Sequence, residues 1–287
     1  MPGHIDVKSN LDSVRSSRRN GMSSTGNLIG TWHSLSGDKT QGRGGNMRRG
    51  LGLFGVVGLL FLSIVLTGCD DKATEAEDDT YDIDRNGIPK FVQTDYIDLS
   101  QIHKISRFRS AEGHDYSDDF EDCRSMKHYY CPLGGDPGQS HTPSWATIEV
   151  RSPVYGTVSR VFEEWAGTQV QIRSADYPAF YFNIFHMAVA DPVTVGETIA
   201  EGQLLGHHIG DQTMSDVAVG VSTPGGWKLI SYFDVMADSL FQTYQADGVS
   251  SRSELVISRE ARDADLLACS GETFTSTGTL GNWVILD

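Results

Sequence analysis

Histidine and carboxylate side chains gather in one short segment, Gly113 to Asp122, which reads GHDYSDDFED. The imidazole of His114 is followed there by the carboxylates of Asp115, Asp118, Asp119, Glu121 and Asp122. Such crowding of negative charge costs free energy unless a cation or an arginine neutralises it. The segment therefore predicts a metal-ion site or pairing with the nearby Arg107, Arg109 and Arg124, and a solvated acidic loop is the alternative.

The elements that must position these groups are short strands. From Ser152 to Val221, runs rich in Val, Ile, Thr, Tyr and Phe alternate with polar residues and are bounded by Gly, Pro or Asp. This pattern is typical of antiparallel strands joined by tight turns, and it predicts a mainly β fold, a small sandwich or barrel. Beyond it we expect a strand over Trp227 to Phe233, a helix over Asp234 to Ala246, and a short strand or docking segment at the C-terminus.

The sequence of this β region is similar to that of a known family. SPVYGTV is followed by an aromatic strand that ends in His186, by the hairpin VGETIAEGQLLG, and by the strand SDVAVGV. This order resembles the lysostaphin or LytM-type zinc endopeptidases, which have the duplicated hybrid motif fold. The resemblance covers residues 110 to 222.

The resemblance implies positions for a zinc site, and two of them are altered. The family's HxxxD ligands correspond to His114 and Asp118, and its supporting histidine corresponds to His186. The family's HxH pair corresponds to Asp216 and Ala218, so the third ligand position holds a residue with no donor atom. His186 and Asp216 therefore occupy catalytic positions in a degenerate site, and we expect no tightly bound cofactor, with zinc or another divalent cation bound weakly through His114, Asp118 and Asp216.

A non-catalytic, peptidase-like domain that binds peptidoglycan or a cell-wall hydrolase partner is the favoured function. Two alternatives stay open. One is an active zinc endopeptidase whose ligand set has been rebuilt with Asp216, or with a nitrogen from His207 or His208. The other is a structural lipoprotein that shares only the β architecture.

The N-terminal region predicts export. Residues 1–46 have the composition of a disordered extension or of a misassigned start. Residues 47–68 read as a signal peptide: two arginines, an apolar run from Leu51 to Leu66, and then Thr67 and Gly68. The ending LTGC resembles the bacterial lipobox, which implies lipidation of Cys69. An uncleaved anchor helix is the alternative, although the run is shorter than the roughly 20 residues of a spanning helix.

The exported chain is strongly acidic. Residues before Cys69 hold 8 of the 23 basic and 3 of the 38 acidic residues, which leaves 15 basic against 35 acidic and a net charge of −20. This charge excludes nucleic acid as a partner and assigns membrane attachment to the lipid alone. We expect a protein of the bacterial envelope that faces the periplasm, and Asp70 and Asp71 resemble an inner-membrane retention signal.

The mature chain divides into three predicted parts: an acidic tether over 69–90, a LytM-like β domain over 91–222, and an α-containing appendage over 223–287 that packs on it. Within the tether, Asp82 to Gly87 has the spacing of half a calcium loop, but Gln93 stands where a carboxylate is needed, which favours a solvated linker. Cys123, Cys131 and Cys269 predict one disulfide and one remaining thiol, and the sequence leaves the pairing open.

Overall fold

The computed structural model describes residues 80–135, 145–210 and 213–287, so residues 1–79, with the predicted signal peptide and Cys69, lie outside the described residues. The strands are β1 (Ile102–Ser106), β2 (His128–Pro132), β3 (Glu149–Arg151), β4 (Gly156–Glu164), β5 (Gly167–Ser174), β6 (Phe180–Val189), β7 (Thr198–Ile199), β8 (Leu204–His208), β9 (Ser215–Thr223), β10 (Gly226–Ile230), β11 (Cys269–Ser270), β12 (Thr273–Phe274) and β13 (Trp283–Ile285). The helices are α1 (Ile83–Asn86), α2 (Tyr232–Val235), α3 (Asp238–Ala246) and α4 (Arg259–Ala264), with 3₁₀ turns η1 (Leu99–Gln101), η2 (Trp145–Thr147) and η3 (Arg252–Leu255).

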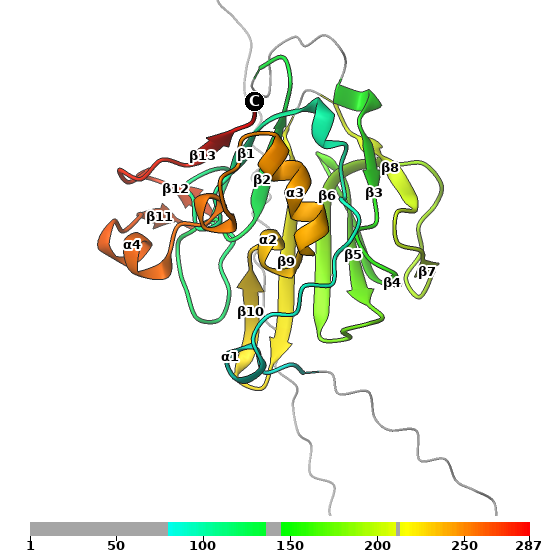
Figure 1. The fold of residues 1–287 in the computed structure, drawn as a ribbon, viewed down its shortest axis with the longest axis horizontal. Coiled ribbons are helices and arrows are strands. Elements are labelled where there is room, and N and C mark those ends of the chain that lie inside the picture. Colours follow the sequence, from blue (N-terminus) through cyan, green and yellow to red (C-terminus); the bar gives the residue numbers. More distant parts are fainter. Residues whose placement is uncertain (1–79, 136–144, 211–212) are drawn as a thin grey trace, which may run out of the picture. The chain divides into compact units, whose positions relative to one another are not determined.

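Eleven of these strands form one sheet in the order β13-β1-β2-β9-β6-β5-β4-β7, to which β10 adds through β9, β8 through β6, and β3 through β8 (Figure 1). The named strand pairs are antiparallel. The predicted mainly antiparallel β fold is confirmed. The sheet is open rather than closed into a barrel.

The pattern of buried and partly exposed residues differs from strand to strand. In β5 every second residue is buried, whereas six of the ten residues of β6 and seven of the nine residues of β9 are buried, because these central strands are covered on both faces. Helices α2 and α3 lie over one face of the sheet (Figure 1) and bury Phe233, Phe241 and Tyr244 against the main core. A smaller apolar cluster that includes Phe185 and Ala218 lies apart from that core.

The C-terminal residues extend this sheet. β10 pairs with β9, and β13 pairs with β1 in the register Ile105↔Val284. The predicted strand after residue 226 ends at Ile230, where Ser231 caps α2 by accepting a hydrogen bond from the Phe233 amide. The predicted helix over 234–246 is therefore two helices, α2 and α3.

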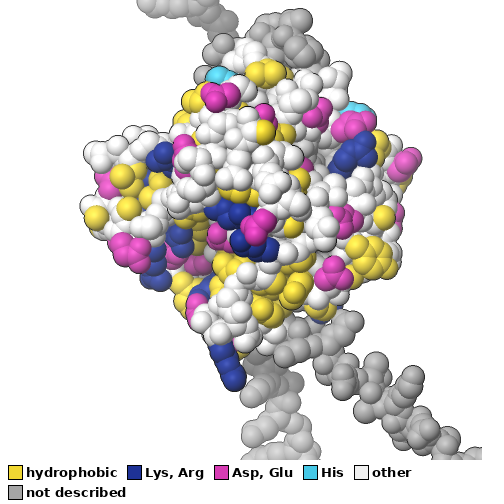
Figure 2. Space-filling view, in the orientation of Figure 1, with side chains coloured by type: hydrophobic (Ala, Val, Ile, Leu, Met, Phe, Trp, Pro, Cys, Tyr) yellow, Lys and Arg dark blue, Asp and Glu magenta, His cyan; other side chains and the backbone are white. Residues whose placement is uncertain are grey.

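The acidic half-loop at Asp82 is a helix cap. The Asp82 side chain accepts a hydrogen bond from the Arg85 amide at the start of α1, and Asp84 forms an ion pair with Lys228 at 2.7 Å. Among the described residues, no helix is long and apolar enough to span a membrane. Acidic and basic side chains are interspersed over the face seen in Figure 2, and no continuous basic area is visible on its described part.

Candidate functional site

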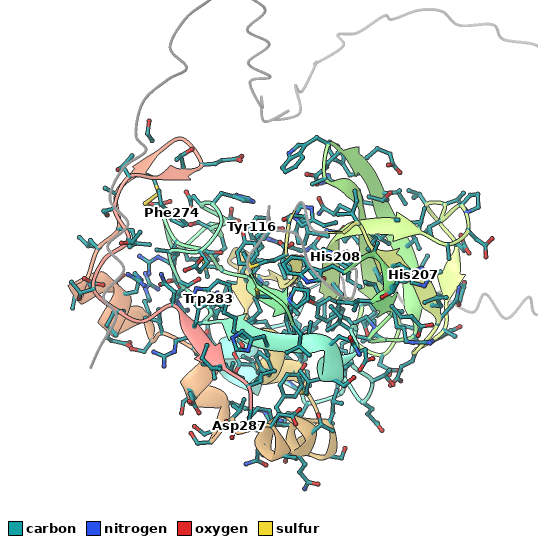
Figure 3. The ribbon with its side chains drawn as sticks, turned by 90° about the horizontal axis from the view of Figure 1, so that it is seen from above. Tyr116, His207, His208, Phe274, Trp283 and Asp287 are labelled. Atoms are coloured by element: carbon teal, nitrogen blue, oxygen red, sulfur yellow. A yellow bond between two sulfur atoms is a disulfide. The ribbon has the colours of Figure 1, made fainter. Side chains whose placement is uncertain are left out.

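Three adjacent strands bring together charged residues from distant parts of the chain. β9 lies between β2 and β6, with Tyr129 of β2 opposite Asp216 of β9. Lys127 directly precedes β2, and His186 lies within β6. Since successive strand residues face opposite sides, Lys127 and Tyr129 point away from His128, which contacts Ser231 at the start of α2. Figure 3 shows Tyr116 on the side of the sheet away from α2 and α3.

A buried ion pair lies at the centre of this site. The Lys127 ammonium is 2.5 Å from Asp216 Oδ2, and the two side chains are only 1% and 0% exposed. Burial alone would lower the pKa of Lys127 and raise the pKa of Asp216, because it disfavours charge. Their mutual attraction outweighs burial, so the pKa of Lys127 is raised and that of Asp216 is lowered. Both groups are therefore charged at neutral pH.

His186 approaches the other carboxylate oxygen. Its Nε2 is 3.1 Å from Asp216 Oδ1, and its Nδ1 donates to the carbonyl of Ala166 at 3.2 Å. Burial lowers the pKa of His186, but the neighbouring Asp216 carboxylate reverses this and raises it overall. The residue has a φ of 61°, which a non-glycine residue rarely adopts, so the fold holds this imidazole in place at some conformational cost.

His114 contacts the same ammonium. Its Nδ1–H donates to the carbonyl of Asp115 at 2.9 Å, which leaves the Nε2 lone pair directed at Lys127 Nζ at 3.2 Å. Burial and then the positive charge of Lys127 lower the pKa of His114. The imidazole is therefore neutral and accepts a hydrogen bond from Lys127.

Aromatic rings complete the surroundings of Lys127. Its Nζ lies 4.2 Å from the ring centre of Phe185 and 4.9 Å from those of Tyr116 and Tyr129. Tyr116 packs edge-on against Phe185, with ring centres 5.7 Å apart. Ring faces attract a cation through their negative charge density, so they stabilise an ammonium in the absence of water.

Asp118 points to backbone groups rather than to His114. Its Oδ1 accepts hydrogen bonds from the amides of Phe120 and Glu121, and its Oδ2 accepts one from the amide of Leu229 in β10. Among the other acidic residues of this segment, Glu121 is paired with Arg109 and Arg124, each at 2.7 Å, as arginine pairing predicts. Burial would raise the pKa of Glu121, but the two guanidinium groups lower it overall.

The remaining candidate ligands do not complete a metal site. Ala218 is 1% exposed and has no donor atom. His208 is buried, its Nδ1 accepts a hydrogen bond from the Gly210 amide, and burial lowers its pKa to about 4. His207 lies next to it, opposite Glu149 of β3 (Figure 3). In the described ranges no group of three or more His, Cys, Asp or Glu residues could hold a metal ion, so the residues present do not fit the zinc that the resemblance implies.

The disulfide joins the acidic loop to the C-terminal region. Cys123 and Cys269 are linked, with Cα atoms 5.7 Å apart, and Cys131 is buried in β2 outside this bond. The expected disulfide is thus confirmed, and the structure supplies the pairing.

Lys127 is the site residue that sequence reasoning missed. The one available signal is a lysine within the largely apolar run MKHYYC, whose residues are all buried in the structure. A charged residue in such a run requires a buried partner, but the sequence does not show that the partner is Asp216.

Comparisons with known proteins give limited matches. No protein-family model matches the chain, and no curated protein matches it. A solved structure of cbpa from L. salivarius REN is 20% identical, covers 28% of this chain and 48% of that chain, and has a TM-score of 0.20. A putative glycyl-glycine endopeptidase lytM from Ruminococcus gnavus is 15% identical, covers 47% of this chain and 59% of that chain, and has a TM-score of 0.28.

Two further matches cover more of the solved chains. The SpoIIQ-SpoIIIAH pore forming complex contains a chain that is 12% identical, with 53% of this chain and 96% of that chain covered and a TM-score of 0.33. The M23 metalloprotease Pseudoalterin from the deep sea is 16% identical over 50% of this chain and 73% of that chain, with a TM-score of 0.29. This chain spans about half the length of the first two matched chains. Identities and TM-scores this low leave function to be inferred from the side chains themselves.

Proposed function

We propose that this protein is a lipid-anchored protein of the bacterial envelope whose peptidase-like β domain binds peptidoglycan or a cell-wall hydrolase partner and does not cleave peptide bonds. One observation carries the proposal: Asp118 is occupied by three backbone amides, and Ala218 offers no donor. Zinc-dependent hydrolysis requires three protein ligands and an open position for water. The residues of this site do not supply that set.

An exposed aromatic residue beside the site supports a binding role. Trp165, in the turn between β4 and β5, is 80% exposed, and the next residue, Ala166, holds the imidazole of His186. Large aromatic side chains supply much of the energy of recognition at binding surfaces, so an exposed tryptophan beside the site is a candidate contact for a ligand or partner. Near this hairpin is a cavity of about 350 Å³ lined by Val161, Glu163, Thr168, Val189, Ala190, Asp191, Pro192 and Val193.

The anchoring part of the proposal rests on the sequence. The apolar run before LTGC supports lipidation of Cys69, and the net charge of −20 after it supports a periplasmic domain held off the membrane surface. The acidic segment after Cys69 has the composition of a tether.

Co-sedimentation with peptidoglycan sacculi tests this function. We expect the protein to sediment with sacculi and to release no soluble peptide fragments, with or without added zinc. Trp165→Ala should weaken sedimentation at least several-fold, whereas Leu266→Ala, which removes another highly exposed apolar side chain (71% exposed), should not.

Each result separates the candidate functions. Release of peptide fragments on adding zinc would establish the active endopeptidase alternative. If the protein does not sediment, captures no cell-wall hydrolase from envelope extracts and shows no turnover, it is a structural lipoprotein and the binding proposal is wrong.

A further inference from the structure

We propose that the Lys127 ammonium is a built-in cation that takes the place of a metal ion in this site. The inference rests on the proposed non-catalytic function and explains how the cluster of His114, Asp216 and His186 persists without a metal. It has a specific consequence: the wild-type site is independent of divalent ions, and shortening Lys127 opens a latent site for a borderline cation such as Zn²⁺ or Co²⁺.

The first support is the direction of the lone pairs. The hydrogen bond from His114 Nδ1–H to the Asp115 carbonyl leaves Nε2 unprotonated, and Nε2 lies 3.2 Å from Lys127 Nζ. Asp216 Oδ2 lies 2.5 Å from the same nitrogen. A neutral imidazole nitrogen and a carboxylate oxygen are metal-ligating atoms, and a backbone bond of this kind is what orients a ligating histidine. Both are here directed at an ammonium.

The second support is charge. Asp216 is 0% exposed, and an isolated buried carboxylate is too costly to persist. The Lys127 ammonium neutralises it at Oδ2, and His186 contacts Oδ1. Without Lys127, a metal ion would have to supply this positive charge. Because the ammonium belongs to the chain, the charge is always present and cannot dissociate as a metal ion can.

The third support is the aromatic surroundings. Phe185, Tyr116 and Tyr129 direct ring faces at Nζ within 4.9 Å. Ring faces stabilise an ammonium through its diffuse charge, whereas zinc prefers nitrogen, sulfur or oxygen lone pairs. The surroundings of Lys127 are therefore suited to a lysine head group in a dry site.

Two substitutions in the full-length chain test the inference, Lys127→Ala and Lys127→Met. Both remove the positive charge, but alanine vacates the space beside His114 and Asp216 and methionine fills it. We expect Zn²⁺ to raise the melting temperature of Lys127→Ala markedly and to bind it at least tenfold more tightly than the wild type in calorimetric titration. Zn²⁺ should have much less effect on Lys127→Met.

Cobalt gives a readout that does not depend on stability. Co²⁺ bound to Lys127→Ala through nitrogen and oxygen ligands should show visible d–d absorption, and adding His114→Ala to that variant should abolish it. The wild type should show no such absorption, and EDTA should leave its melting temperature unchanged.

Three outcomes would overturn the inference. The wild type could bind zinc stoichiometrically or lose stability in EDTA, Lys127→Ala could fold but gain nothing from Zn²⁺ or Co²⁺, or the variant could fail to refold even with zinc present. None of these measurements uses peptidoglycan. Peptide release by the wild type would instead contradict the proposed non-catalytic function. The metal-binding measurements test the inference about Lys127 independently of that result.

Discussion

Two residues of one short motif have different roles in the folded protein. His114 keeps a lone pair directed into the site, because its other ring nitrogen donates to the neighbouring Asp115 carbonyl. Asp118, four residues later, directs its oxygens to the amides of Phe120, Glu121 and Leu229. Hydrogen bonds from backbone amides to an ionised carboxylate are strong, so these three amides satisfy the Asp118 side chain locally. Residue type and spacing therefore correctly predict that His114 faces the site, but they wrongly predict the same for Asp118.

Asp118→Ala tests this structural role. It leaves three backbone amides without their acceptor and removes one of the hydrogen bonds that join the acidic loop to β10, so we expect the free energy of unfolding to fall by about 1–2 kcal/mol. Zinc content should equal that of the wild type. Asp122→Ala, which removes an exposed carboxylate of the same loop, is the control and should change stability by less than about 0.5 kcal/mol. A fall in zinc content only in Asp118→Ala would show that Asp118 is a ligand.

At the scale of elements, β2 separates a structural histidine from the charged site. His128 faces α2, where its Nδ1–H donates to the Ser106 carbonyl and its Nε2 accepts from the Ser231 hydroxyl, both at 2.8 Å. Lys127 and Tyr129 face the other way and belong to the site. One strand thus ties the helical layer to the charged cluster.

His128 should make the fold sensitive to mild acid. Burial lowers its pKa from 6.5 to about 4, so the unfolded chain binds a proton at a pH where the folded chain does not. This contribution to stability is complete above pH 6.5 and is lost as the pH falls toward 4, with a total of about 3 kcal/mol. Chemical denaturation at pH 7 and pH 5 should show a smaller difference for His128→Gln than for the wild type. Equal differences would contradict the assignment.

The Cys123–Cys269 disulfide joins the acidic loop to β11 across 146 residues of sequence. Closing a loop this long should stabilise the fold by about 2–5 kcal/mol. We expect a reductant to lower the wild-type melting temperature but to have no effect on Cys123→Ala/Cys269→Ala. Cys131→Ala is the control and should keep the wild-type response to reductant. Non-reducing peptide mapping that recovers Cys131 in a disulfide would overturn the pairing.

At the scale of the whole molecule, charge and attachment are separate properties. The chain after Cys69 carries a net charge of −20, which opposes approach to an anionic membrane surface. The proposed membrane attachment therefore depends on a lipid or an anchor helix near Cys69, outside the described residues.

Cys69→Ser distinguishes the two modes of attachment. If a lipid on Cys69 is the anchor, the variant should move from the membrane fraction toward the soluble periplasmic fraction or accumulate as an unprocessed precursor that high salt does not release. Metabolic labelling with a fatty acid should mark the wild type and not the variant. A wild type that stays unlabelled while bound to the membrane would identify the segment as an uncleaved anchor helix.

The sequence alone determined features that depend on near neighbours. Alternation and glycine turns predict the β4 to β9 strands, because the two-residue period of a strand is visible in the residues themselves. Three cysteines after Cys69 predict one disulfide, and the export signal predicts an oxidising compartment. These conclusions require no knowledge of which strands are neighbours.

Only the tertiary structure decided what the site contains. Lys127 meets Asp216 because β2 pairs with β9, and this pairing joins strands that are far apart in the chain. Long-range contacts of the same kind place Cys269 next to Cys123 and the Leu229 amide of β10 next to Asp118. Long-range pairing depends on the summed packing of all strands rather than on any local pattern, so a short motif cannot show whether its carboxylate will face a metal, an ammonium or a backbone amide.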